Sequence, residues 1–221
     1  RTAIKPSSDI AGTIIATAEE QKASLIVIGA RGNSLVEGIL LGSVSMAVLR
    51  RARTSVLIMR HKIIEDLKVK TYDMFCPMIL SRILCPVDFS QYSDKAVALL
   101  GSTTGVRGVI LLHVVSQGES ETEIDDAIRN AREQIEAVRS RLAGLGIDAR
   151  AMVRTVDPAI EIARTADEED VSVVWMNSRG RGWFEELLLG STAYSVAMNT
   201  RRPVIIILRP ESEWRHIPVK R

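Results

Sequence analysis

Gly29-Ala-Arg-Gly32, followed after nine residues by Gly42-Ser43, is the stretch that decides how this chain is built, because the pattern occurs twice. The second copy is Asn177-Ser-Arg-Gly180, again followed after nine residues by Gly190-Ser191. Each copy comes after an apolar run and precedes a segment typical of a helix. Glycine lets a backbone turn sharply and lie close to a ligand, and the first amides of a helix attract anions. The pattern therefore favours a phosphate pocket in each copy.

Composition excludes several classes of protein. The 221 residues, 46% of them hydrophobic and 25% charged, suffice for one large or two modest domains. The 29 basic and 27 acidic side chains leave a net charge of +2, too little for a strong attraction to nucleic acid or an anionic membrane. No apolar run approaches the roughly 20 residues of a membrane span. Cys76 and Cys85 lack the companions of a metal site, so we expect reduced thiols, a cytoplasmic protein and no metal centre.

The second part of the chain shows a complete alternation of strands and helices. The expected strands are 83–88, 108–115, 147–156, 171–176 and 203–208, and the expected helices are 90–100, 121–143, 159–166 and 191–199. Residues 121–143 carry apolar side chains every three or four positions, the period of an amphipathic helix. Because parallel strands need crossovers and the crossovers are helical, the order predicts an α/β fold with an open parallel sheet and helices on both faces.

Residues 1–60 repeat only the back half of this pattern. Their expected elements are a helix over 6–20, a strand over 25–28, a helix over 43–50 and a strand over 55–59. The first two strands have no counterpart before Arg1, so we expect a tandem of two domains whose first member is incomplete in this sequence. The predicted divisions are a partial first domain 1–60, a linker 61–81, a complete second domain 82–209 and a tail 210–221.

The expected topology brings chemistry to one edge of the sheet. In an open parallel sheet, ligands bind beyond the carboxyl ends of the strands, where the strand order reverses. If strand 83–88 lies beside strand 171–176, Asp88 meets the segment 177–180 there. A carboxylate for ribose or base, an apolar edge for a purine and helix amides for phosphate outline a nucleotide site. Asp88 as a helix brace and Ser43 and Ser191 as helix N-caps remain alternatives.

The repeated motif and three further segments resemble the universal stress protein family. The motif is preceded by Ile-Leu-Leu or Leu-Leu-Leu before Gly-Ser, and the further segments are Pro86-Val-Asp88-Phe-Ser90, Leu112-His-Val114-Val and Pro203-Val-Ile-Ile. The resemblance covers nearly all of residues 1–60 and 82–209. It implies, for each domain, a five-stranded parallel sheet of order 3-2-1-4-5, the adenine nucleotide alpha hydrolase-like fold.

The resemblance to the ATP-binding members also implies which residues surround a nucleotide. In the second domain these would be Pro86, Asp88 and Val114 at base and ribose, Met176, Asn177 and Gly180 at ribose and α-phosphate, and Gly190, Ser191 and Thr192 at the outer phosphates. In the first domain they would be Ile28, Gly29, Gly32, Gly42, Ser43 and Val44. The implied ligand is ATP, ADP or AMP, and the resemblance leaves open an accompanying Mg²⁺ bound through the phosphates.

Asn177 departs from the family pattern, since the ATP-binding members have a glycine there. Asparagine tolerates a left-handed backbone better than other residues with a side chain, so the expected turn can survive. Its side chain, however, fills space that a ligand needs. Binding in the second domain and loss of binding both stay open, and AMP is easier to fit than ATP.

Catalytic machinery is hard to find in this sequence. There is no Walker lysine after Gly-Ser, no nucleophile elbow and no His-Glu metal motif, and we assign no catalytic residue. Arg31, Arg179 and Arg181 are near enough in sequence to contact phosphate, or they face solvent. His113 lies in an apolar strand and is expected to be a core histidine. The sequence favours an adenine-nucleotide-binding stress sensor or regulator, with an interaction module of the same fold or a weak ATPase as alternatives.

The last strand of each domain suggests how domains associate. Residues 56–59 and 204–208 are apolar and β-branched, and such strands at a sheet edge invite pairing with another chain. In the family these strands join two domains. We therefore expect an internal pseudo-dimer and leave a homodimer open, with no nucleic acid or membrane as a partner.

Overall fold

The computed structural model describes residue 2 and residues 4–30, 41–60, 78–116, 120–180 and 189–208. Its helices are α1 (Ile10–Glu20), α2 (Ser43–Arg51), α3 (Gln91–Ser102), α4 (Glu121–Gly144), α5 (Pro158–Glu168) and α6 (Ser191–Asn199). Its strands are β1 (Leu25–Gly29), β2 (Ser55–Met59), β3 (Arg82–Pro86), β4 (Gly108–Val115), β5 (Asp148–Thr155), β6 (Val173–Asn177) and β7 (Val204–Ile207). Most of the linker predicted over 61–81 and all but residue 208 of the chain after β7 lie outside the described residues.

Side-chain caps decide where several helices begin. Asp9 caps α1 by accepting a hydrogen bond from the Gly12 amide at 2.9 Å, so the helix starts four residues later than the predicted Pro6. Asp157 caps α5 in the same way, and Pro158 follows at the first helical position, where it needs no amide hydrogen. The periodicity of the sequence thus located the helices, and the caps set their ends.

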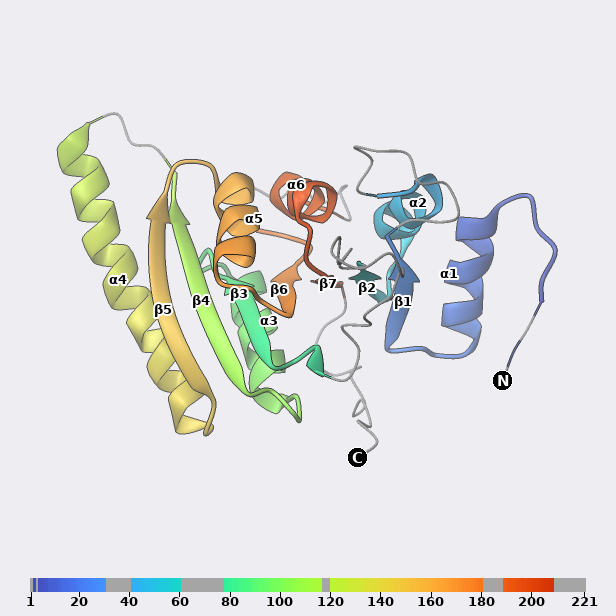
Figure 1. Cartoon of the computed structure of the whole chain (residues 1–221), viewed down its shortest axis with the longest axis horizontal. Helices are drawn as coiled ribbons and strands as arrows, with labels where there is room; N and C mark the ends of the chain where they lie inside the picture. Colours follow the sequence, from blue (N-terminus) through green and yellow to red (C-terminus); the bar gives the residue numbers. More distant parts are fainter. Residues whose placement is uncertain are drawn as a thin grey trace, which may run out of the picture.

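All the strands lie in one sheet of order β1-β2-β7-β6-β3-β4-β5 (Figure 1). Every neighbouring pair is parallel except β2 and β7, which run antiparallel with Leu57 opposite Ile205. The five strands after residue 80 follow the order third, second, first, fourth, fifth, as the sequence analysis expected for that part. The predicted α/β class with helices on both faces of an open sheet is confirmed. The sheet has more strands than the five predicted, because β2 pairs with β7 and extends the sheet into the first part of the chain. It is mixed rather than wholly parallel, because this one pair is antiparallel.

Two apolar cores lie on opposite faces of the sheet. Helices α1, α2, α5 and α6 pack on one face, over residues such as Ile58, Val174 and Ile206. Helices α3 and α4 cover the other face, where Trp175 is 1% exposed and donates its ring N–H to the Ala96 carbonyl of α3 at 3.0 Å. We call residues 4–60 the first unit and residues 78–208 the second unit.

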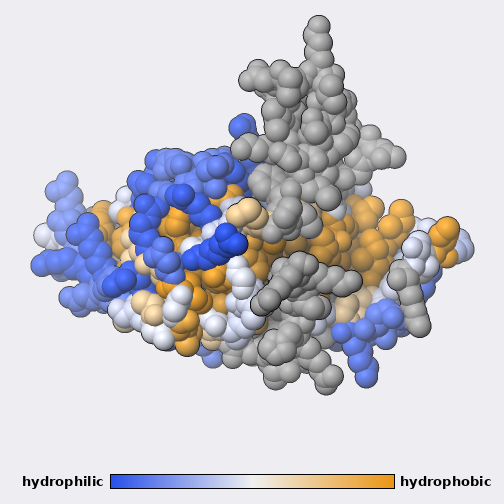
Figure 2. All heavy atoms as spheres, turned by 60° about the horizontal axis from the view of Figure 1, so that its bottom comes forward, coloured by the Kyte–Doolittle hydropathy of each residue, from blue (hydrophilic) through white to orange (hydrophobic). Residues whose placement is uncertain are grey.

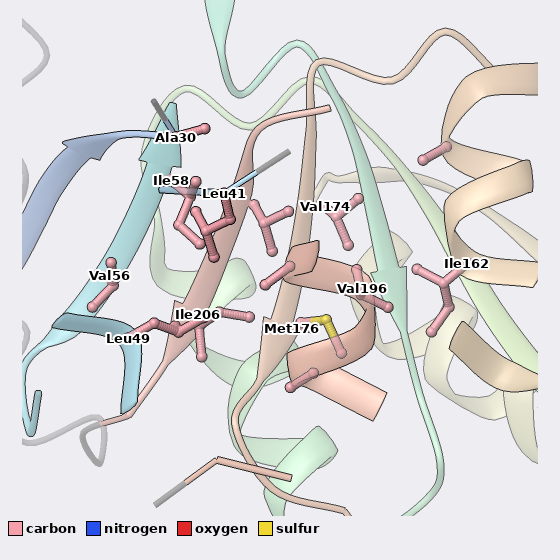
Figure 3. Close-up of a cluster of buried hydrophobic side chains, with 14 of the residues drawn as sticks. Ala30, Leu41, Leu49, Val56, Ile58, Ile162, Val174, Met176, Val196 and Ile206 are labelled. Atoms are coloured by element: carbon pink, nitrogen blue, oxygen red, sulfur yellow. The ribbon is translucent and has the colours of Figure 1, made fainter. Parts of the chain in front are cut away.

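The two units share a continuous core across the antiparallel pair. Figure 3 shows Leu49 of the first unit beside Ile206 of the second, in the same cluster of buried side chains. Arg60, at the end of β2, is buried and donates a hydrogen bond to the Ala197 carbonyl in α6. Both edges of β2 and both edges of β7 are therefore paired within the chain, and neither strand offers an edge to a second copy in this arrangement.

Strand β1 is less covered by helices than β6, the strand that precedes the second copy of the motif. Val27 of β1 is 59% exposed, whereas Trp175, at the matching position of β6, is fully buried under α3. Figure 2 shows hydrophobic residues gathered toward this end of the molecule and hydrophilic ones at the α4 end. Among the described residues, no helix has the length and apolar character that crossing a membrane requires.

Candidate functional site

A pocket of about 530 Å³ opens at the carboxyl ends of β3, β4 and β6, where the strand order reverses. It is lined by every residue that the sequence analysis assigned to the second site: Pro86, Asp88, Val114, Met176, Asn177, Gly180, Gly190, Ser191 and Thr192. These residues come from three strand ends and from the first turn of α6. The parallel topology thus gathers side chains that are up to about a hundred positions apart in the sequence.

Asp88 braces the start of α3 and still faces the pocket. Its Oδ1 accepts hydrogen bonds from the Ser90 amide at 3.1 Å and from the Ser90 hydroxyl at 2.6 Å. Ser90, rather than Asp88, is the N-cap, since its Oγ accepts from the Ser93 amide. The second carboxylate oxygen, Oδ2, lies against Gly180. Asp88 can therefore serve a helix and a ligand through different oxygens.

Gly180 and Gly190 stand where a side chain has little room. A β-carbon built on Gly180 would lie 2.7 Å from Asp88 Oδ2, and one built on Gly190 would lie 3.1 Å from the carbonyl oxygen of Ser178. Gly190 has φ −72° and ψ 157°, a backbone that any residue adopts. The glycines therefore let the loop after β6 lie close to both Asp88 and α6, which makes the wall of the pocket backbone rather than side chain.

Gly190 is also the N-cap of α6, which corrects the alternative that Ser191 caps this helix. No side chain accepts a hydrogen bond from the first amides of α6, and the first backbone bond runs from the Tyr194 amide to the Gly190 carbonyl at 2.9 Å. The amides of the preceding three residues have no partner within the helix by geometry. They carry the partial positive charge of a helix start toward the pocket, and the exposed Ser191 hydroxyl lies beside them.

Asn177 does not make the left-handed turn that the sequence analysis expected. It is the last residue of β6, paired in parallel with Ile207, and it is not among the residues with positive φ. Its side-chain amide donates a hydrogen bond to the Tyr92 carbonyl in α3. The left-handed backbone that asparagine would tolerate at this position is not adopted, because the strand continues through it. The amide group is anchored to α3 while the residue still borders the pocket.

The apolar part of the pocket is built from strand ends and small helix residues. Met176 and Ala193 are buried, and Pro86 and Val114 are partly buried, in line with a surface on which a planar base can lie. Ile162 of α5 closes the wall behind them. These side chains offer contact area without charge, which suits an aromatic ring.

His113 lines the pocket instead of lying wholly in the core. Its Nδ1 lies 2.7 Å from the Val87 carbonyl oxygen, which can only accept, so Nδ1 carries the proton and donates. The ring stacks on Phe89, with centroids 4.4 Å apart and planes at 27°. Phe89 has φ 56°, a left-handed conformation that is uncommon for a residue with a side chain. The expectation of a core histidine is thus only half right, since the ring is bonded but borders the site.

The remaining chemistry-bearing groups give no metal centre or reactive thiol in the described part of the chain. Burial raises the pKa of the Cys85 thiol to about 12, so this cysteine stays protonated. No group of three or more His, Cys, Asp or Glu side chains that could hold a metal ion occurs among the described residues. Cys76 lies outside them.

The first copy of the motif has the same local geometry as the second. Gly42 is the N-cap of α2 with φ −74° and ψ 160°, and its amide donates to the Ala30 carbonyl at 2.7 Å, as the Gly190 amide does to Ser178. Ser43 is the first helical residue and not the cap, which corrects the alternative that this serine caps α2. Ile28 and Gly29 end β1, and Val44 lies in the first turn of α2.

The first site is nevertheless not assembled among the described residues. Gly32 lies outside them, and no described strand pairs with the outer edge of β1 to supply the partner that β3 supplies to β6. Because β2 and β7 are antiparallel, the carboxyl ends of β1 and β6 lie at opposite edges of the sheet. The two copies therefore do not form one pocket.

Several pocket residues escaped the sequence analysis. Asn130 and Gln134 of α4 line the pocket and are hydrogen bonded to each other at 2.9 Å, and Pro158 borders it from α5. The two amides stand one helical turn apart on the polar face of an amphipathic helix, and this spacing is the feature of the sequence that could have identified them as pocket residues. Arg179 also lines the pocket, whereas the sequence analysis left open whether it contacts phosphate or faces solvent.

Fold and site together define an open α/β protein with a helix start that no side chain caps and a carboxylate at the topological switch point. The universal stress protein family matches residues 3–60 and 80–207, so the chain belongs to this family. The resemblance stated from the motifs is thereby confirmed.

Relatives of this chain include proteins of one unit and of greater length. Universal stress protein MJ0577 of Methanocaldococcus jannaschii is 26% identical over 160 residues, which cover 61% of this chain and 99% of that protein. Universal stress protein Rv2623 of Mycobacterium tuberculosis is 31% identical over 196 residues, or 83% of this chain, and the match spans only 61% of that protein. A crystal structure of a universal stress protein from Archaeoglobus fulgidus superposes with a TM-score of 0.64 at 26% identity, over 95% of this chain and 70% of that one.

Proposed function

We propose that this universal stress protein binds an adenine nucleotide, ATP, ADP or AMP, in the pocket of its second unit and acts as a cytoplasmic stress sensor or regulator. The observation that carries the proposal is the convergence of Asp88, Gly180 and the uncapped start of α6 on one pocket. Those three features supply a ribose acceptor, a close backbone wall and an anion site. The family resemblance supports the same ligand class.

Each part of the pocket has a role in this proposal. Asp88 Oδ2 accepts a hydrogen bond from ribose or base while Oδ1 remains bonded to Ser90. Pro86, Val114 and Met176 cover the face of the base. The amides and hydroxyls of Ser191 and Thr192 donate to phosphate oxygens, and any Mg²⁺ is held through the phosphates, because the described residues offer no cluster of metal ligands.

Isothermal titration calorimetry of the full chain with ATP, ADP and AMP tests the proposal. We expect saturable binding of at least one of the three with a Kd tighter than about 1 mM. Asp88→Asn should weaken that binding about tenfold, since a charge-assisted hydrogen bond becomes a neutral one. The matched control is Asp94→Asn in the first turn of α3, where the carboxylate pairs with Arg141 outside the pocket. Absence of binding by all three nucleotides would refute the proposal.

The second candidate is an interaction module of the same fold without nucleotide binding. Asn177 favours it, because a side chain stands where the ATP-binding members have glycine and is anchored to α3. Asn177→Gly separates the two functions. If the wild-type chain binds no nucleotide and this variant does, the module is the function of the second unit. Phosphate release with ATP and Mg²⁺, measured at steady state, decides whether bound ATP is also hydrolysed slowly.

A further inference from the structure

Arg179 occupies a particular place in the pocket wall. Its backbone lies against α6, since its Cα would be 4.0 Å from a β-carbon on Gly190. Its side chain crosses to α3, where the guanidinium carbon lies 5.9 Å from the centre of the Tyr92 ring. Among the described residues that line the pocket, it is the only lysine or arginine. One permanent positive charge thus stands between the start of α6 and the start of α3.

The ring of Tyr92 has a second cation near it. Lys95, one turn further along α3, places its ammonium nitrogen 5.7 Å from the same ring centre. The Tyr92 carbonyl accepts the amide hydrogen bond of Asn177, which fixes the first turn of α3 beside the end of β6. Two cations that share one aromatic ring repel each other, and a bound anion relieves this repulsion. Only Arg179 of the two borders the pocket.

The amides of α6 and the Arg179 guanidinium recognise different properties of a phosphate chain. Amides at one helix start can satisfy one phosphate group, whether the nucleotide carries one phosphate or three. A guanidinium beside that group gains further energy for each added negative charge, and its paired N–H groups match phosphate oxygens. The arginine can therefore discriminate nucleotides by their number of phosphates.

We propose that Arg179, supported by the ring of Tyr92, makes the second-unit site selective for nucleoside polyphosphates over the monophosphate. This inference rests on the proposed nucleotide binding and adds its phosphate specificity. It also reverses the expectation from the sequence that AMP fits more easily than ATP. Asn177, which motivated that expectation, instead holds the platform on which the arginine lies.

The test compares ATP and AMP binding to the full chain by calorimetry at constant ionic strength. For the wild type we expect ATP to bind more tightly than AMP. Arg179→Gln should weaken ATP binding about tenfold or more and AMP binding less than about threefold, as expected for the loss of a charged hydrogen-bond donor. Arg179→Lys keeps the charge and should recover most of the ATP affinity. Lys95→Gln is the matched control, because it removes the other cation on Tyr92 and should change both affinities less than about threefold.

The role of Tyr92 in positioning Arg179 is tested by the ratio of ATP to AMP affinity in two Tyr92 variants. Tyr92→Phe keeps the ring and should retain the ATP preference, whereas Tyr92→Leu should lower the ratio of ATP to AMP affinity. Equal loss for ATP and AMP in Arg179→Gln, unchanged ATP binding, or a wild type that binds AMP more tightly than ATP would each overturn the inference while nucleotide binding stands. A wild type that binds neither nucleotide would instead refute the proposed function itself.

Discussion

Gly180→Ala probes the closest contact in the pocket. The new methyl group would lie 2.7 Å from Asp88 Oδ2, too close for the carboxylate to stay in place. The carboxylate is not free to rotate away, because its Oδ1 holds Ser90 through two hydrogen bonds. At a net value of about 1 kcal/mol for each bond, moving Asp88 should lower the free energy of unfolding by about 1–2 kcal/mol.

A double-mutant cycle isolates this effect from other consequences of the substitution. In an Asp88→Ala background the carboxylate atoms that the methyl group would meet are gone, and no other described residue beyond its chain neighbours lies within 4 Å of it, so Gly180→Ala should cost less than about 0.5 kcal/mol. Urea unfolding followed by circular dichroism gives all four free energies. Gly144→Ala, at the end of α4 with no neighbour within 4 Å, is the control and should be neutral or stabilising. An equal cost of Gly180→Ala in both backgrounds would show that Asp88 is not what excludes a side chain there.

Three further predictions concern other parts of the structure. Gly190→Ala should weaken nucleotide binding and cost about 1–3 kcal/mol of stability in urea unfolding, because its methyl group meets backbone that cannot rotate away. The guanidinium of Arg150, and then that of Arg82, hold the pKa of the Glu169 carboxyl below its usual value, so their stabilisation is present above that value and is lost as the pH falls through the lowered pKa. Glu169→Gln should therefore reduce the free energy of unfolding at pH 7 and change it little at a pH below the lowered pKa. An equal loss at the two pH values would exclude the ion pairs as the cause. Since burial raises the pKa of Cys85 to about 12, iodoacetamide should label this thiol only after unfolding, as peptide mass mapping can establish.

Local pattern was enough to predict most of the elements of this fold. Residues 121–143 were expected as a helix from their apolar period alone, and α4 covers Glu121–Gly144. The strand order of the second unit follows from the family resemblance, and the expected topology places the carboxylate of Asp88 at the switch point. Such features depend on the local sequence pattern or on the topology of the fold, and both can be predicted from a single sequence.

Contacts between distant segments could not be predicted from the sequence. The need for glycine at position 190 comes from the Ser178 carbonyl, which only the folded loop brings to 3.1 Å, and not from the backbone torsion that a turn motif suggests. The placement of Arg179 over Tyr92 joins residues 87 positions apart in the chain, as does Asn177 with the same tyrosine across 85. No periodicity records which side chain of a loop will meet which helix.

The antiparallel pair β2–β7 explains why two nearly identical motifs have unequal surroundings. It joins the two units through one sheet and one core, so their stabilities are coupled, yet it turns their strand ends to opposite edges. A ligand in the pocket at α6 would therefore contact, among the described residues, those of the second unit, while its binding energy would stabilise the sheet that both units share. The first motif, which keeps its glycine at position 29, can be tested separately. Because each of Asp88→Asn and Arg179→Gln should weaken ATP binding to the second site about tenfold, an ATP affinity that is unchanged in the double variant would belong to the first motif.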